Sequence, residues 1–67
     1  RINCVSPGTI LTDGLKSEGK TVLESIKQTI PLGRIGSPNE AAETIIWLLS
    51  NKSSFVSGST ITVSGGR

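Results

Sequence analysis

The stretch SPNEAAETIIWLLS, residues 37–50, constrains the fold most because it predicts a helix with a defined start. Ser37 is a favourable N-cap, Pro38 suits the first helical position, and Glu40 completes a capping box. Apolar side chains follow at helical spacing: Ala41, Ala42, Ile45, Ile46, Leu48 and Leu49, with Trp47 off the centre of the stripe. We therefore predict a helix over residues 38–50.

A strand-like run lies on each side of this helix. Residues 1–6, RINCVS, are rich in apolar and β-branched side chains and stop at Pro7-Gly8. Residues 59–63, STITV, form the second run. Near-continuous apolarity suits a strand that is covered on both faces, so we predict that Cys4 is a small buried residue rather than a nucleophile.

A shorter helical pattern lies in residues 21–30, TVLESIKQTI. Before it, residues 9–20 are typical of a loop with weak or mobile helical character, in which Asp13 is a turn former. Thr21 and Glu24 match a second capping box, and Pro31 ends the pattern. The order strand, loop, helix, helix, strand predicts an α/β fold with parallel strand pairing.

The composition offers little material for an independent core. The chain has 67 residues, of which 34% are apolar and 3% aromatic. It has no His, and its single cysteine forms neither an internal disulfide nor a cysteine-based zinc site, so we predict no metal. A chain of this size then needs a partner or more protein to fold. We expect residues 1–67 to be one partial domain.

The chain begins at Arg1 rather than Met, and no apolar run approaches the ~20 residues of a membrane span. We expect a segment of a larger soluble, cytoplasmic protein without a membrane partner. The net charge is +2, and the basic residues are scattered. We interpret them as a solvated surface rather than a nucleic-acid patch.

Two alternatives from other classes remain open. The sequence Gly33-Arg34-Ile35-Gly36 lies between the two predicted helices, as in the loop with which KH domains clamp an RNA backbone. Glu40 and Glu43 argue against this alternative, because they lie where phosphate would approach. The other alternative is a purely structural segment that completes a sheet supplied elsewhere.

The residues after the first strand suit a polar ligand. In open α/β sheets, ligands bind beyond the carboxyl ends of the strands. Pro7 fixes its own φ, and Gly8 lacks a Cβ that would keep a flat ring away from the backbone. The N–H groups of Thr9 and Ile10 are then free to donate, and Thr12 adds a hydroxyl. Together these groups suit a carboxamide or a phosphate oxygen.

The sequence resembles the C-terminal part of the short-chain dehydrogenase/reductase family. The resemblance covers nearly the whole chain and rests on many weak elements in a fixed order: Asn3, Pro7-Gly8, Thr12, Gly33-Arg34-Ile35-Gly36, Pro38, Glu40, Ser50, Ser53-Ser54, Gly58 and Gly65-Gly66. It implies a Rossmann-type, doubly wound parallel sheet and NAD or NADP as the cofactor. Ser64 departs from the Asp that the family often has there, which bears on a subunit contact.

The resemblance also implies roles for individual positions. The Ile10 backbone would meet the nicotinamide carboxamide, and the Thr12 hydroxyl would hold the carboxamide or the pyrophosphate. Pro7 and Gly8 would line the nicotinamide face beside Thr9. Residues 11–30 would form a mobile substrate-binding loop that contacts an alcohol or carbonyl substrate through these apolar side chains: Leu11, Leu15, Val22 and Ile26.

The family's catalytic tyrosine and its glycine-rich cofactor fingerprint have no counterpart in this chain. We therefore assign no catalytic residue. The resemblance implies that the parent protein transfers a hydride between nicotinamide and an alcohol or carbonyl carbon, as a homo-oligomer (tetramer or dimer). The isolated segment is predicted to be inactive.

Overall fold

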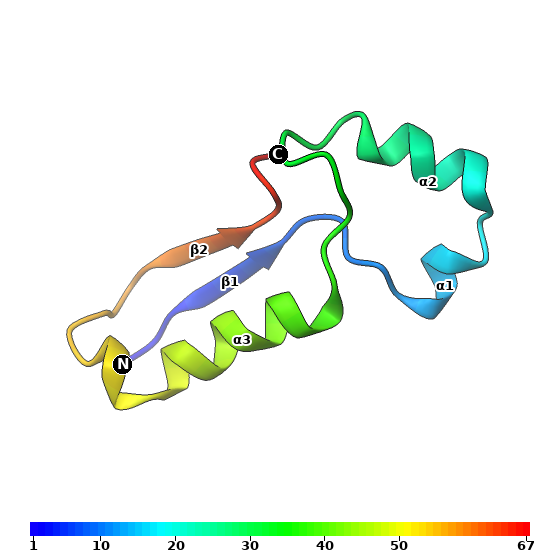
Figure 1. Cartoon of the computed structure of the whole chain (residues 1–67). Coiled ribbons are helices and arrows are strands. Elements are labelled where there is room, and N and C mark those ends of the chain that lie inside the picture. Colours follow the sequence, from blue (N-terminus) through cyan, green and yellow to red (C-terminus); the bar gives the residue numbers. More distant parts are fainter.

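A computed structural model describes residues 1–67. The elements follow the predicted order, with helices between two strands (Figure 1). Their bounds are β1 Cys4–Pro7, α1 Asp13–Lys16, α2 Lys20–Lys27, α3 Pro38–Leu49, the 3-10 turn η1 Asn51–Ser53 and β2 Thr60–Val63.

β1 and β2 form a parallel two-stranded sheet. Cys4 pairs with Thr60, and Pro7 pairs with Val63, so the carboxyl ends of the strands lie level with each other. The predicted parallel pairing is confirmed. Figure 1 shows both strands running toward the end of the molecule where the α1–α2 segment and the C-terminus lie.

α3 begins where the sequence predicts and ends one residue earlier, at Leu49. The Ser37 side chain accepts from the Glu40 N–H, and the Glu40 side chain accepts from the Ser37 N–H, so the predicted capping box is confirmed. Ser50 has extended backbone and also caps η1, which explains the earlier end of the helix.

α3 packs on one face of the sheet and leaves the other face open. Val5, Ile61 and Val63 are partly buried, whereas the alternate strand residues are exposed: Cys4, Ser6, Thr60 and Thr62. The prediction that Cys4 is buried is therefore wrong for this chain. Successive strand side chains point to opposite faces, and Cys4 lies on the face without a covering helix.

The segment before α3 contains more helix than the sequence predicts. Asp13 is not a turn residue but the first residue of α1, whose N-cap is Thr12. The predicted Thr21–Glu24 capping box is wrong: α2 has Gly19 as N-cap with no side-chain cap. Glu24 lies inside the helix and accepts from Lys27 at 3.0 Å.

The ends of the α1–α2 segment are anchored near the strand ends. Ile30, 4% exposed, packs against Gly65, and the Leu32 N–H donates to the Gly65 carbonyl at 3.0 Å. Among the helices and strands, α1 and α2 contact only each other. This segment therefore projects from the sheet (Figure 1), and the molecule measures 43 × 21 × 14 Å.

Two polar side chains close the other end of α3, and the sequence patterns did not single them out for this role. The buried Ser53 hydroxyl lies within 3.2 Å of three carbonyl oxygens, those of Trp47, Leu48 and Ser50. The Arg1 guanidinium also donates to the carbonyls of Leu48 and Ser50. These bonds satisfy C-terminal carbonyls that a helix cannot pair internally.

Candidate functional site

The candidate site begins where β1 leaves the sheet. The Gly8 N–H donates to the Val63 carbonyl at 2.9 Å and marks the end of regular pairing with β2. Beyond it, Thr9, Ile10 and Thr12 lie past the carboxyl ends of both strands. This is the edge of a parallel sheet where α/β folds bind ligands.

A single parallel bridge holds this segment against the residues before α3. The Gly36 N–H donates to the Thr9 carbonyl at 3.1 Å, and the Leu11 N–H donates to the Gly36 carbonyl at 2.8 Å. In such a bridge the central residue, here Ile10, turns its own N–H and C=O away from the partner. The N–H groups of Thr9 and Ile10 donate to no backbone carbonyl and are free for a ligand.

Thr12 is exposed, and its hydroxyl group can still donate one hydrogen bond to a ligand. Its Oγ1 accepts from the Leu15 N–H at 3.3 Å as the N-cap of α1, and its own N–H donates to the Ile10 carbonyl. The hydroxyl hydrogen remains available as a donor. Thr12 therefore starts α1 and at the same time offers a donor in the same segment as Thr9 and Ile10.

Gly8 is glycine for a reason other than the one that the sequence suggested. A Cβ on Gly8 would lie 2.7 Å from the Ser64 Cβ and 2.9 Å from the Ser64 Cα. The space on that side of Gly8 is thus occupied by the chain after β2, not left open for a flat ring. Gly8 lets the two strand ends approach closely, which sets the position of the residues that follow it.

An open cavity of about 320 Å³ lies beside these strand ends. Its lining is polar except for backbone and proline: Ser6, Pro7, Gly8, Thr9, Thr62, Ser64 and Arg67. Hydroxyl groups and one guanidinium suit a polar or anionic group rather than an apolar one.

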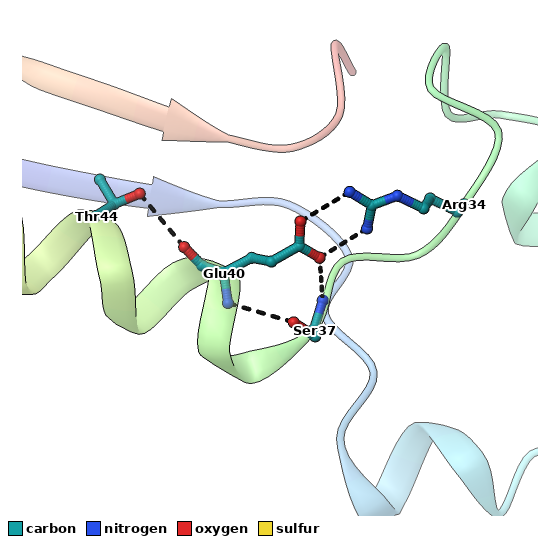
Figure 2. A network of polar contacts seen from close by, with 4 residues as sticks. All are labelled: Arg34, Ser37, Glu40 and Thr44. Carbon is teal, nitrogen blue, oxygen red and sulfur yellow. Dashed lines mark hydrogen bonds and ion pairs between the residues drawn. The ribbon is translucent and has the colours of Figure 1, made fainter.

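The start of α3 carries a network of ionic hydrogen bonds (Figure 2). Arg34 Nη1 and Nη2 donate to Glu40 Oε1 and Oε2 at 2.7 and 2.8 Å, and the Ser37 N–H also donates to Oε1 at 2.9 Å. The hydrogen bonds from Arg34, followed by that from Ser37, lower the pKa of Glu40 from 4.5 to about 2. The hydrogen bonds to Glu40, followed by its negative charge, raise the pKa of Arg34.

This network bears on the RNA-binding alternative. Arg34 is the only cation of the loop 33–36, and both of its terminal nitrogens are paired with Glu40. The loop therefore offers no free positive charge to a phosphate backbone.

The residues predicted to contact substrate are only partly brought to the site. Leu11 follows the bridge directly, and Leu15 lies on α1. Val22 and Ile26 lie on α2, in the projecting segment away from the sheet (Figure 1). Val22 is exposed, while the other three are partly buried.

The remaining features add no second chemical centre. No group of three or more His, Cys, Asp or Glu side chains is placed to hold a metal ion. None of the helices combines the length and apolar character that crossing a membrane requires.

The comparison with solved structures gives the class of protein. A crystal structure of a short-chain dehydrogenase/reductase from Brucella melitensis matches with a TM-score of 0.87 and 44% identity, over 98% of this chain and 27% of that one. A 3-oxoacyl-[acyl-carrier protein] reductase from the same species matches with a TM-score of 0.92 and 38% identity, over 98% of this chain and 25% of that one. A family model described as Enoyl-(Acyl carrier protein) reductase matches residues 1–67. The chain belongs to the short-chain dehydrogenase/reductase family and is an α/β segment of its Rossmann-like fold.

Curated relatives agree with this class. The uncharacterized oxidoreductase YgfF of Escherichia coli is 44% identical over all of this chain and 28% of its own length. An acetoacetyl-CoA reductase of Cupriavidus necator is 43% identical over 97% of this chain and 26% of its own length. The chain thus spans little more than a quarter of the relatives that it matches.

Proposed function

We propose that the protein containing this chain is an NAD(P)-dependent oxidoreductase, and that this chain supplies the wall around the nicotinamide. One observation carries the proposal: the segment that follows the carboxyl ends of two parallel strands contains the free N–H groups of Thr9 and Ile10 and the exposed Thr12 hydroxyl. A carboxamide oxygen accepts hydrogen bonds from such donors. An oxidoreductase class is supported by the relatives, one of which is described as an NADPH-dependent reductase.

The chain's own groups would bind and orient the cofactor. Thr9 and Ile10 donate to the carboxamide through the backbone, and Thr12 donates through its hydroxyl. Pro7 and Gly8 line the adjoining wall. When bound, the nicotinamide would supply or accept the hydride, and the chemistry of the proton transfer would come from residues outside this chain.

The substrate is proposed to be a small alcohol or carbonyl compound that contacts residues 11–30. Two of the relatives are described as acting on acetoacetyl-CoA and on 3-oxoacyl-[acyl-carrier-protein]. Short 3-oxoacyl thioesters are therefore the first substrates to test. Without a tyrosine anywhere in the chain, residues 1–67 alone are proposed to show no turnover.

The test uses the full-length protein with NADH or NADPH and a panel of carbonyl compounds that includes acetoacetyl-CoA. We expect oxidation of one reduced cofactor, and a Thr12→Val variant with a raised KM for it. Thr12→Ser is the matched control, since it keeps both the capping oxygen and the donor. Absence of turnover with every substrate, or an unchanged cofactor KM in Thr12→Val, would contradict the proposal.

A homo-oligomer, dimer or tetramer, is also proposed for the full-length protein. α3 leaves large apolar side chains exposed, among them Ile46 at 57% and Leu49 at 80%. Exposed apolar patches of this kind mark contact surfaces, either with the rest of the full-length subunit or with a second subunit. Light scattering on the full-length protein tests the proposal, and a monomer mass would contradict it.

A further inference from the structure

The position of the Thr9–Leu11 segment depends on a contact with another part of the chain. Its only backbone anchor beyond β1 is the bridge to Gly36, which fixes the direction of the free Ile10 N–H. Ile10 also packs on Gly36 so closely that a Cβ there would lie 3.0 Å from its Cδ1. Whatever fixes Gly36 therefore also fixes the position of the Thr9 and Ile10 N–H groups.

Gly36 is fixed by residues on both sides of it in the sequence. On one side, the Ser37 N–H donates to Glu40 Oε1 at 2.9 Å. On the other side, Arg34 donates hydrogen bonds to both oxygens of the same carboxylate at 2.7 and 2.8 Å (Figure 2). Arg34 and Glu40 also line one small cavity, about 50 Å³, together with Thr9 and Ile10. Glu40 thus binds residues on both sides of Gly36, and the ion pair lies beside Thr9 and Ile10.

A capping box alone does not need Arg34. The Ser37–Glu40 capping box uses two backbone N–H groups, the Ser37 hydroxyl and only one carboxylate oxygen, whereas the bidentate pair with Arg34 also fixes the orientation of the carboxylate. The side chains of Arg34 and Glu40 are 56% and 41% exposed, and exposed ion pairs add little to global stability. The pair's main effect is therefore local geometry.

We infer that Arg34 and Glu40 are positioning residues for nicotinamide binding, acting through Gly36 on the backbone donors of Thr9 and Ile10. This inference rests on the proposed function. A small displacement of positioned groups lowers binding and rate steeply without unfolding the protein. The adenosine half of the cofactor lacks the carboxamide, so its binding serves as an internal reference.

The experiment compares Arg34→Gln, Glu40→Gln and the double variant in the full-length protein. Glu40→Gln keeps an acceptor for the Ser37 N–H and removes the ion pair. We expect each single variant to weaken NADH or NADPH binding roughly tenfold. Binding of the adenosine half, ADP for NAD or 2′-phosphoadenosine 5′-diphosphate for NADP, should stay unchanged. The Tm should fall only slightly, because an exposed ion pair contributes little to global stability. The double variant should lose no more than either single one, because the two residues act as a unit.

Glu43→Gln and Lys52→Gln are the matched controls, since they remove one exposed charge of each sign from α3 and η1. Both should bind cofactor as the wild type does. Arg34→Lys keeps the charge but not the bidentate geometry, so its affinity for the cofactor should lie between those of Arg34→Gln and the wild type. It also replaces Arg34→Gln if the latter does not fold.

The outcomes separate the inference from the proposed function. Equal losses of dinucleotide and adenosine-half binding, or variants that are already partly unfolded at the temperature of the binding measurement, would show a general structural role and overturn the inference. Wild-type dinucleotide binding in both single variants would also overturn it. If the wild-type protein binds no nicotinamide cofactor, the proposed function fails first.

Discussion

Gly8 and Ser64 lie so close together that the two strand ends tolerate no side chain between them. Gly8→Ala would place a Cβ 2.7 Å from the Ser64 Cβ and 2.9 Å from its Cα, which forces the backbone to shift. Overpacking of this kind destabilises by about 1–3 kcal/mol. We expect that loss in the free energy of unfolding of the full-length protein, measured by denaturant titration.

Gly14→Ala is the control for this prediction. Gly14 lies in α1, and a Cβ there would meet nothing closer than the Thr12 Oγ1 at 3.9 Å. Alanine favours a helix over glycine, so this variant should be as stable as the wild type or slightly more stable. Equal losses in the two variants would show that contact with Ser64 is not the cause.

Glu40 makes stability depend on pH in a defined window. Its pKa is lowered to about 2 in the folded protein, from 4.5 without its partners, so the unfolded state binds the proton first as the pH falls. The stabilisation is fully present above pH 4.5 and is lost as the pH falls toward 2. We expect Glu40→Gln to reduce the steepness of the acid-induced stability loss by as much as one proton. Identical slopes in urea titrations of both proteins between pH 5 and 3 would contradict this assignment.

Among the elements, α3 depends on a side chain from the turn that follows it. Ser53 is 1% exposed, and its hydroxyl lies within reach of the carbonyls of Trp47, Leu48 and Ser50. Ser53→Ala removes this donor, while the carbonyls keep others from Ser50 and Arg1, so we expect a cost of about 0.5–1.5 kcal/mol. Ser54→Ala, at an exposed neighbour, should change stability little. Thermal unfolding of the two full-length variants checks the difference, and matching Tm values would refute the role of Ser53.

The elements that the sequence predicted well are those with local causes. Ser37, Pro38 and Glu40 act within one helical turn, so the start of α3 was predictable from three neighbouring residues. The parallel pairing followed from the order of elements. The weak helical character expected of residues 9–20 is the four-residue helix α1, whose bounds such a short pattern did not give. The capping box at Thr21 was wrong because the N-cap lies two residues earlier, at Gly19.

The features that the sequence did not predict depend on contacts between distant parts of the chain. Cys4 is exposed because it lies on the face of the sheet that α3 does not cover. Gly8 meets Ser64, and Arg1 reaches the end of α3, across more than forty residues in each case. Periodicity and spacing carry no information about such pairs. Of the candidate site, the free donors at Thr9 and Ile10 were predictable, whereas the bridge to Gly36 that orients them was not.

At the scale of the whole molecule, the chain has secondary structure but hardly any interior. Only three residues are buried, and two of these, Ile30 and Leu48, are apolar. They lie at different places, Ile30 beside Gly65 and Leu48 at the end of α3. A folded domain offsets the ordering of its residues mainly with buried apolar area, and the chain buries little of it.

We therefore expect residues 1–67, produced alone, to lack a cooperative unfolding transition, although the full-length protein has one. α3 is the strictest indicator, because its 12 residues and capping box make it the strongest local helix, yet isolated helices of this length are marginal in water. Hydrogen exchange should show amides of α3 protected in the full-length protein and nearly unprotected in the isolated chain. Far-UV circular dichroism during urea titration should give a gradual change without a sigmoid. A cooperative transition with protected α3 amides in the isolated chain would show that local capping and the two-stranded sheet are sufficient, and that the surrounding protein is not needed for this segment to fold.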